Sequence, residues 1–204
     1  FREHVSKAMR MMDDIIDLEL EKVDLIINKV ASDPEEADIR HVEHELWLKI
    51  KDMALRGRRT GLGITAEGDM LAALGLRYGS DEAIDFAVEV HRTLALAAYR
   101  ASVKMAEERG AFPIYDAARE ASNPMIERIK EADPELYAEM VKHGRRNIAM
   151  LTIAPTGTTS LMSQTTSGIE PVFRPVYKRR RKINPSDKDQ VALFVDETGE
   201  KFVE

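Results

Sequence analysis

The first third of the chain is patterned for long amphipathic helices. From Val5 to Val30 the apolar residues recur every three or four positions, which is the spacing of one helical face. Asp33-Pro34 then suits a helix start, with Asp33 as the capping residue, so a second helix is predicted to run to about Arg56. Its expected core face consists of Ile39, Val42, Leu46, Ile50 and Met53.

Four further helices are expected before residue 145. The apolar positions over 66–74 predict a short helix. Those over 80–109 predict a long one, and they go most of the way round it, which indicates that this helix is largely buried. Asn123 and Asp133 each precede a proline and begin two short helices, the second of which ends at His143-Gly144.

The pattern changes after residue 146. Residues 147–154 form a compact apolar run that Pro155 ends, which is typical of a strand buried on both faces. A loop rich in Thr, Ser and Gly follows, then a short helix and two strand-like stretches over 172–183 and 191–195. The predicted fold class is α+β with helices dominant. Because a strand with two apolar faces needs a neighbour on each side, the chain by itself is expected to be marginally stable or to self-associate.

Composition narrows the expected partners. The 204 residues are 44% hydrophobic and 32% charged, with a net charge of −6 and an isoelectric point near 5.5. A mildly acidic protein binds polyanions poorly, so nucleic acid is not expected as a partner. No apolar run approaches the ~18 residues of a membrane span and no signal peptide is recognisable, so a cytoplasmic protein without a membrane partner is predicted. The chain has no cysteine, which removes disulfides, thiolate metal sites and cysteine radicals from what it supplies alone.

The strongest candidate for chemistry is the loop between the predicted strand and the short helix after it. It reads Pro155-Thr156-Gly157-Thr158-Thr159-Ser160. Backbone N–H groups at a helix start, the positive end of the helix dipole and several hydroxyls form a cradle for a diphosphate that needs no lysine. No Gly-Lys-Ser/Thr follows, so hydrolysis of a magnesium nucleotide is not implied. A plain connecting turn is the alternative.

An acidic cluster in the first helix is a second candidate. Asp13, Asp14 and Asp17 have the spacing by which isoprenyl-diphosphate synthases hold magnesium and a diphosphate on a helix. Asp14 and Asp17 fall off the apolar stripe, whereas Glu19 falls within it, so a solvated face is the stronger interpretation. An all-helical synthase also needs a facing acidic cluster, which the sequence lacks. No metal ligand is therefore expected.

Histidines and a basic run complete the candidates. His41 and His44 lie opposite the expected core face, which favours solvent over zinc. His91 falls within an apolar stripe and is predicted to be a hydrogen-bonded core histidine. The basic run over 178–182 either contacts phosphates or pairs with carboxylates, and the sequence favours neither.

Five motifs carry a resemblance that extends over essentially the whole chain. In order they are Arg58-Arg59-Thr60-Gly61-Leu62-Gly63-Ile64, Leu76-Arg77-Tyr78-Gly79-Ser80, Arg109-Gly110-Ala111-Phe112-Pro113 and the stretches 147–160 and 165–173. Together they closely resemble the large subunit of ribonucleotide reductases. Two more, Met12-Asp13-Asp14-Ile15-Ile16-Asp17 and Tyr177-Lys178-Arg179-Arg180-Arg181-Lys182, are most similar to the adenosylcobalamin-dependent, class II branch.

The resemblance implies a fold and a reaction. Enzymes of this family fold as a roughly ten-stranded α/β barrel and convert ribonucleotides to 2′-deoxyribonucleotides with a cysteine radical. Residues 1–204 are expected to be a central to C-terminal segment of that catalytic barrel, with 1–145 mainly helical and 146–204 containing the strand, the phosphate loop and the later strands. The loop 155–160 matches the family's substrate-phosphate site, with the backbone N–H groups of Gly157, Thr158 and Thr159 as donors.

The same resemblance sets the expected cofactor and partners. The parent enzyme is expected to use adenosylcobalamin, with none bound to this segment alone. Its partners are expected to be a ribonucleotide substrate and the remainder of the reductase chain. No catalytic residue is expected here, because the family's radical cysteine precedes the region that corresponds to Phe1.

Two other functions stay open. One is a structural or binding domain that keeps the fold and has lost catalysis. An Asn-x-Cys-x-Glu pattern upstream in the gene would argue against this alternative and support the enzyme. The other is a helical diphosphate-metal enzyme built on Asp13, Asp14 and Asp17, whose binding would need magnesium and would be lost in Asp14→Ala.

We predict that the isolated chain has no reductase activity with adenosylcobalamin, a ribonucleotide and a dithiol. It contains no thiol that can become the hydrogen-abstracting radical. The measurement is deoxyribonucleotide formation beside a blank without protein. Turnover above that blank would contradict the assignment.

Overall fold

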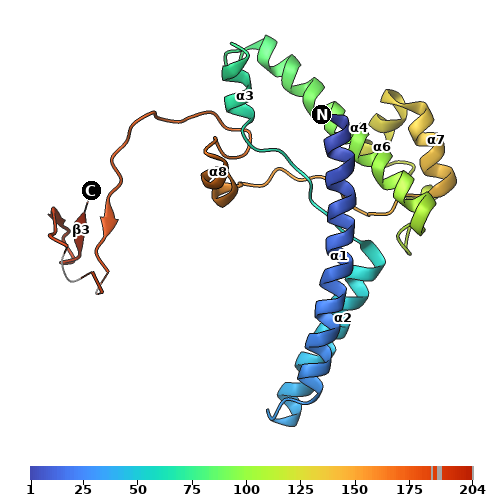
Figure 1. Ribbon diagram of the computed structural model, residues 1–204, viewed down its shortest axis with the longest axis horizontal. Coiled ribbons are helices and arrows are strands. Elements are labelled where there is room, and N and C mark those ends of the chain that lie inside the picture. Colours follow the sequence, from blue (N-terminus) through green and yellow to red (C-terminus); the bar gives the residue numbers. More distant parts are fainter. Residues whose placement is uncertain (185, 188–189, 204) are drawn as a thin grey trace.

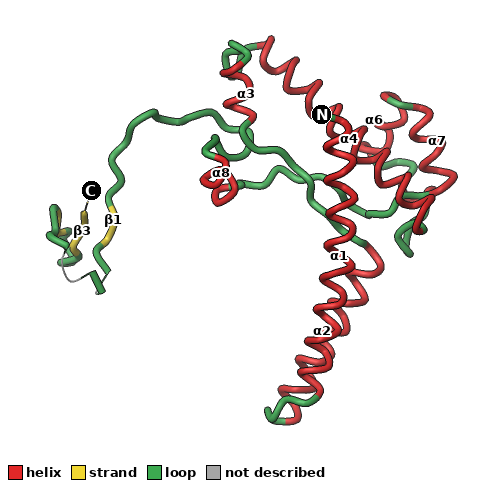
Figure 2. The backbone as a smooth tube through the Cα atoms, in the orientation of Figure 1, coloured by secondary structure: helices red, strands yellow, loops and turns green. Residues whose placement is uncertain are grey.

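The computed structural model describes residues 1–184, 186–187 and 190–203, and helices dominate it (Figure 1, Figure 2). The helices are α1 (Arg2–Ala31), α2 (Ala37–Gly57), α3 (Glu67–Ala73), α4 (Asp81–Arg109), α5 (Ala117–Glu120), α6 (Pro124–Ala132), α7 (Pro134–His143) and α8 (Gly157–Ser163). The strands are β1 (Arg181–Lys182), β2 (Phe194–Val195) and β3 (Lys201–Val203). Within the described ranges no helix is both long and apolar enough to cross a membrane.

The main hydrophobic core lies where α1 crosses α4. The first half of α1, the second half of α4 and the short helices α6 and α7 surround it (Figure 1). Met9, Met105, Leu136 and Met140 are at most 1% exposed there. The predicted helices over 5–30, 66–74 and 80–109 are confirmed, as is a short helix after residue 154, which begins at Gly157 within the predicted loop.

Side-chain caps fix three helix starts at the expected residues. Ser80 Oγ, Asn123 Oδ1 and Asp133 Oδ1 each accept a hydrogen bond from a first-turn backbone N–H of α4, α6 and α7, at 3.4, 2.9 and 3.0 Å. Each cap satisfies a donor that has no partner inside its helix and contributes about 0.5–2 kcal/mol. These starts were readable because a capping side chain and its helix are neighbours in sequence.

The predicted start of α2 was wrong. The helix begins at Ala37, three residues after Pro34. Asp33 does not cap it, because its Oδ2 pairs with Lys29 Nζ at the end of α1, 2.5 Å away. The turn between α1 and α2 is therefore closed by an ion pair rather than by a helix cap.

The predicted core faces of α2 and of the first part of α4 were also wrong. The residues of the expected α2 face that lie more than half exposed are Ile39, Val42, Leu46 and Met53. Helix α1 packs against another side of α2, where Lys51 Nζ lies 2.5 Å from Asp24 Oδ1. In α4, burial is concentrated from Leu94 onward, whereas Ile84 and Val88 are about half exposed. Amphipathicity marks a face that can be buried, and these faces have no partner among the described residues.

Strands are shorter than the sequence predicted. Residues 147–154 form a single parallel bridge, Leu62↔Leu151, instead of a buried strand. The stretches 172–183 and 191–195 contribute only β1 and β2, which flank β3 in an antiparallel sheet of order β1-β3-β2. A ladder extends only as far as its partner strand does. No barrel is formed by residues 1–184, 186–187 and 190–203.

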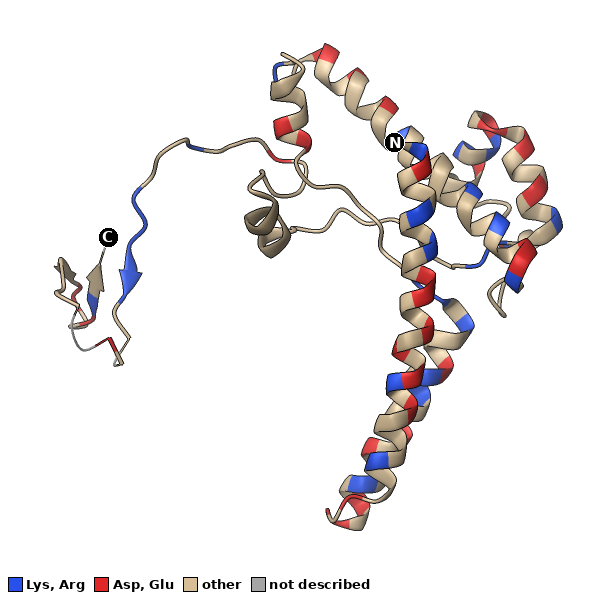
Figure 3. Ribbon diagram, in the orientation of Figure 1, with Lys and Arg blue, Asp and Glu red and all other residues tan. Residues whose placement is uncertain are grey.

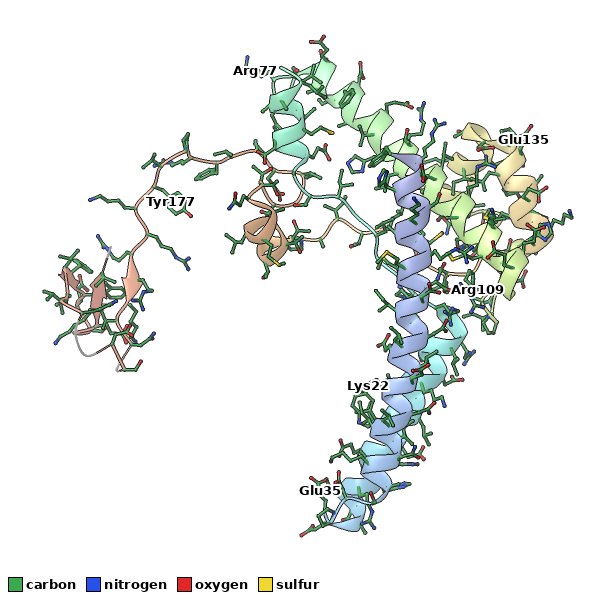
Figure 4. All side chains as sticks on the ribbon, viewed as in Figure 1. Lys22, Glu35, Arg77, Arg109, Glu135 and Tyr177 are labelled. Carbon is green, nitrogen blue, oxygen red and sulfur yellow. The ribbon has the colours of Figure 1, made fainter. Side chains whose placement is uncertain are left out.

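A buried carboxylate joins the helical part to the extended segments. Asp13 is 0% exposed, and its two oxygens accept four hydrogen bonds. Arg58 Nε (2.8 Å) and Asn147 Nδ2 (3.0 Å) donate to Oδ1, and Arg109 Nη1 and Arg146 Nε (3.2 Å each) donate to Oδ2. Figure 4 shows Arg109 reaching α1 from the end of α4. Four segments of the chain therefore meet at one side chain.

The partners of this carboxylate are themselves fixed. Arg58 is 4% exposed and stands in the left-handed region, with φ 45°, where it ends α2. The amide of Asn147 also donates to the carbonyl of Arg58 at 3.0 Å and accepts from Ser102 Oγ at 2.9 Å. Burial raises the pKa of Asp13, but the hydrogen bonds and charges of Arg58 and Arg146 outweigh it and hold that pKa below its usual value.

We predict that Asp13→Asn lowers the free energy of unfolding by about 3–5 kcal/mol at neutral pH. An asparagine offers one acceptor oxygen and turns an NH₂ donor toward donors, so Arg58 loses its buried counter-charge and is left with Asp17, whose side chain is 51% exposed. The measurement is urea unfolding followed by circular dichroism. Asp14→Asn is the control: its side chain is 52% exposed and pairs with the part-exposed Arg109, so a change under about 1 kcal/mol is expected.

The stabilisation that Asp13 provides has a defined pH dependence. Because the folded pKa of Asp13 is lowered, its stabilisation is fully present above the unfolded value of about 3.9 and is lost as pH falls through the folded pKa. The difference between wild type and Asp13→Asn should therefore be constant at neutral pH and shrink below about pH 4. Equal stability of Asp13→Asn and Asp14→Asn at neutral pH would contradict this role.

Candidate phosphate-binding site

Two extended segments carry the chain from the buried carboxylate to the candidate loop. Residues 58–63 and 147–152 run parallel, with hydrogen bonds from Thr60 N to Ala149 O (2.9 Å), from Leu62 N to Met150 O (2.7 Å) and from Thr152 N to Leu62 O (3.0 Å). Beyond them one segment enters α3 and the other enters α8, and Figure 2 shows the two green tubes lying together before they reach these helices. The site is thus built from parts about ninety residues apart.

Glycines permit the close contacts along this path. A Cβ at Gly63 would lie 2.3 Å from the carbonyl oxygen of Thr152, and one at Gly68 would lie 2.6 Å from the carbonyl oxygen of Glu170. Neither distance is compatible with a side chain, so backbone packs on backbone at both places. This gives a physical reason for glycine at Gly63, within the motif that carried the resemblance, and at Gly68 in α3.

Helix α8 begins with donors that its own N-cap side chain does not satisfy. Thr156, the N-cap, has left-handed dihedrals (φ 48°, ψ 28°) and its side chain makes no capping hydrogen bond. The first-turn N–H groups of Gly157, Thr158 and Thr159 have no partner one turn earlier in the helix, and these residues are exposed. They point to a place where an anion can bind.

The six residues singled out from the sequence do not all share this exposure. Pro155 is exposed and Thr156 is half-buried. Ser160 is buried, and its Oγ donates to the carbonyl oxygen of Gly157 at 2.8 Å, so its hydroxyl is committed within the helix. A Cβ on Gly157 would meet no atom within 4 Å and its φ is not in the left-handed region, so the fold itself does not require glycine there.

The N-terminal end of α3 holds the segment that follows α8. Thr65 Oγ1 donates to the carbonyl oxygen of Thr166 at 3.1 Å and lies 3.0 Å from Thr156 Oγ1. Asp69 Oδ2 accepts from the N–H of Thr166 at 2.8 Å, and Thr156 Oγ1 accepts from the N–H of Gly168 at 2.8 Å. Thr65 and Asp69 are not predicted from the sequence, because no local pattern marks contacts made across roughly one hundred residues.

His91 ties this assembly to α4. Its Nε2 lies 2.7 Å from Oε2 of Glu67, which is 6% exposed at the first position of α3. The prediction of a hydrogen-bonded histidine is confirmed, although His91 is 34% exposed rather than in the core. The pair fixes α3, and with it the residues that hold the loop.

The aspartate cluster of α1 is neutralised by arginines. The carboxylate oxygens of Asp13, Asp14 and Asp17 lie within 4.8 Å of one another, a separation that could suit a metal ion. Arg58 bonds Asp13 and Asp17, and Arg109 bonds Asp13 and Asp14, so guanidinium groups supply the positive charge. This arrangement does not favour the diphosphate-metal alternative. The solvated face predicted for Asp14 and Asp17 is confirmed, since their side chains are 52% and 51% exposed, whereas Asp13 of the same cluster is buried.

The predicted position of one other carboxylate in the first helix was wrong. Glu19 was expected inside the apolar stripe of the first helix, yet it is exposed. Ile16 and Leu20 occupy the buried face on either side of that position, and Asp13 continues their stripe.

The basic run over 178–182 is paired at its end. Arg181 donates to Asp187 (3.0 Å) and to Gln190 (2.8 Å), Lys182 pairs with Glu200, and Arg180 lies over the ring of Phe194. Figure 3 shows the basic colour concentrated on β1 and the chain leading into it, away from α8. This geometry supports structural pairing for part of the run.

Comparison with known proteins decides the family. Residues 1–193 match the family described as "Ribonucleotide reductase, barrel domain". The chain belongs to this family. The resemblance predicted from the sequence motifs is therefore confirmed.

Relatives within the ribonucleotide reductase family include proteins named as vitamin B12-dependent reductases and proteins named as reductase subunit alpha. The vitamin B12-dependent ribonucleoside-diphosphate reductase of Mycobacterium tuberculosis is 36% identical over 143 residues, 70% of this chain and 18% of that protein. The protein of the same name from Thermoplasma acidophilum is 30% identical over 178 residues, 87% of this chain and 18% of the relative. The ribonucleoside-diphosphate reductase subunit alpha of Treponema pallidum is 30% identical over 128 residues, 61% of this chain and 15% of the relative. The matches span less than a fifth of each relative.

Substitution by alanine is predicted to affect stability differently at two glycines of the site. Gly68→Ala should lower the free energy of unfolding by about 1–3 kcal/mol, because its Cβ would overlap backbone atoms of Glu170 and Pro171. Gly157→Ala should leave stability unchanged or raise it by up to ~1 kcal/mol, since there is open space and alanine favours a helix. Urea midpoints of the two variants beside the parent are the measurement. Equal midpoints for both variants would refute the packing described.

Proposed function

We propose that this chain is a segment, 1–204, of the catalytic barrel of an adenosylcobalamin-dependent ribonucleotide reductase. The parent enzyme converts ribonucleoside diphosphates to 2′-deoxyribonucleoside diphosphates. Support comes from membership in the barrel-domain family and from relatives whose names state vitamin B12 dependence and a ribonucleoside-diphosphate substrate. In this proposal 1–145 provides mainly helices, 146–204 provides the phosphate loop and strands, and the rest of a ten-stranded barrel comes from the remainder of the reductase chain.

Within that enzyme, the loop 155–160 binds the substrate diphosphate. The observation that carries this role is the start of α8, where Thr156 does not cap and three exposed residues follow it whose N–H groups have no partner one turn earlier in the helix. The dipole at a helix start favours an anion by about 0.3–1 kcal/mol, up to ~2 when partly buried, and charge-assisted hydrogen bonds from the N–H groups add to this. Thr158 and Thr159 place two exposed hydroxyls beside the same donors.

The chemical steps need groups that this chain does not contain. A thiyl radical that removes a substrate hydrogen requires a cysteine, and the chain has none. Adenosylcobalamin supplies radical chemistry when it is bound to the parent enzyme. The described residues form no donor set that identifies a corrinoid site, so we assign none of them to it. The role of this segment is to bind and orient the substrate phosphates in a cytoplasmic enzyme.

The prediction for this function compares two variants in the full-length reductase. Gly157→Val should weaken use of a ribonucleoside diphosphate more than Thr158→Ala, because a branched side chain blocks the approach of phosphate to the backbone whereas the second change removes one hydroxyl. The measurements are KM, kcat and adenosylcobalamin affinity, and the cofactor affinity should stay the same.

Equal kinetics of both variants and the parent would show that 155–160 is only a connection. Loss of adenosylcobalamin binding in Gly157→Val would point instead to a general disturbance of the barrel. Gly157→Ala, which meets open space, tests the approach of phosphate with the smallest change to the fold.

A further inference from the structure

The contacts around Thr156 form a chain of hydrogen bonds with a defined direction. The hydroxyl of Thr65 can donate one hydrogen bond. It donates to the carbonyl oxygen of Thr166, 3.1 Å away, because a carbonyl can only accept. The 3.0 Å contact between Thr65 Oγ1 and Thr156 Oγ1 must then use the proton of Thr156. Thr156 Oγ1 in turn accepts from the N–H of Gly168 at 2.8 Å. The hydrogen bonds therefore all have one direction: Gly168 donates to Thr156, Thr156 donates to Thr65, and Thr65 donates to Thr166.

This direction keeps the side chain of Thr156 away from its own helix. A threonine at an N-cap ordinarily accepts from a first-turn N–H and has extended dihedrals. Here its hydroxyl is used on both sides by Thr65 and Gly168, and its φ is 48°. The left-handed region is unfavourable for a β-branched residue and persists only where the surroundings hold it.

The acceptor at the end of the chain is fixed from two sides. The carbonyl oxygen of Thr166 also accepts from the N–H of Ala66 at 3.2 Å, and the N–H of Thr166 donates to Asp69 Oδ2 at 2.8 Å. Thr65 thus connects a rigid backbone unit beside α3 to the residue that begins α8.

We propose that Thr65 is a positioning residue for the phosphate loop: by accepting a hydrogen bond from the hydroxyl of Thr156, it holds Thr156 in its left-handed conformation and prevents it from capping α8. The first-turn N–H groups then stay available to the substrate diphosphate. Thr65 itself does not touch the substrate. This inference rests on the proposed function of the loop, and its test separates the two.

The test is made in the full-length reductase with ADP as the substrate. Thr65→Val keeps the shape of the side chain and removes the hydroxyl. It should raise KM by about three- to tenfold, as expected for one hydrogen bond, and change kcat by less than about twofold. Thr65→Ser restores the hydroxyl and should return KM to that of the parent.

Thr60→Val is the matched control. Thr60 Oγ1 also donates to a backbone carbonyl, that of Ala149 at 3.2 Å, on the same pair of extended segments but away from the loop. Its KM should equal that of the parent. A similar rise in KM for Thr60→Val and Thr65→Val would overturn the positioning role, because it would show a general loss of structure.

Gly157→Val separates this inference from the proposed function. If Gly157→Val raises KM and Thr65→Val does not, the loop binds phosphate but Thr65 does not position it. If neither variant raises KM, the proposed function fails, and the inference fails with it.

A second variant tests the same bond from its other end, which matters if Thr65→Val does not fold. Thr156→Ala removes the hydroxyl that bonds both Thr65 and Gly168, so residue 156 is no longer held in its left-handed conformation, and KM should rise for that reason. In the double variant Thr65→Val/Thr156→Ala the rise should be no greater than that of the more affected single variant, since the two hydroxyls act as one unit. Effects that multiply in the double variant would overturn the proposal.

Discussion

The carboxylate of Asp13 is the interaction on which the other parts of this structure depend. A fully buried charge is unfavourable unless it is paired and hydrogen-bonded, and Asp13 has four donors, three of them from arginines. Those donors come from the end of α2, the end of α4 and the segment that begins at Arg146. The charge therefore specifies one arrangement of these segments, because any other arrangement leaves a buried ion without partners.

From this point main-chain contacts determine the course of the chain as far as the candidate site. The two extended segments leave the carboxylate side by side and pair through their main chains. Gly63 and Gly68 then let backbone lie against backbone, and Ala66 and Thr156, both left-handed, redirect the chain into α3 and α8. Non-glycine residues in this conformation are held by their surroundings. Their clustering at the starts of α3 and α8 agrees with a site whose donors are main-chain N–H groups.

Sequence reasoning succeeded where structure is local and failed where it depends on distant contacts. The starts of α4, α6 and α7 were readable from Ser80, Asn123 and Asp133, because each cap acts within its own helix. The face of α2 was not, since amphipathicity does not say which neighbour is present to cover a stripe. Asp13 was taken with its exposed neighbours because the arginines that bury it lie 45 to 133 residues away. Thr65 carried no signal for the same reason.

The parallel pairing of 58–63 with 147–152 has a consequence for the order of folding. The main-chain hydrogen bond from Thr60 N to the carbonyl oxygen of Ala149 closes a loop of 89 residues, whereas the caps and turns of α4, α6 and α7 close within a few. Long loops are closed late, because their entropy is lost before their contacts stabilise the chain. The helices around the main core can therefore form first, and the loop that begins α8 takes its final shape only when both extended segments have met. Local unfolding in the native protein should follow the reverse order, with α8 exchanging its amide hydrogens faster than α4.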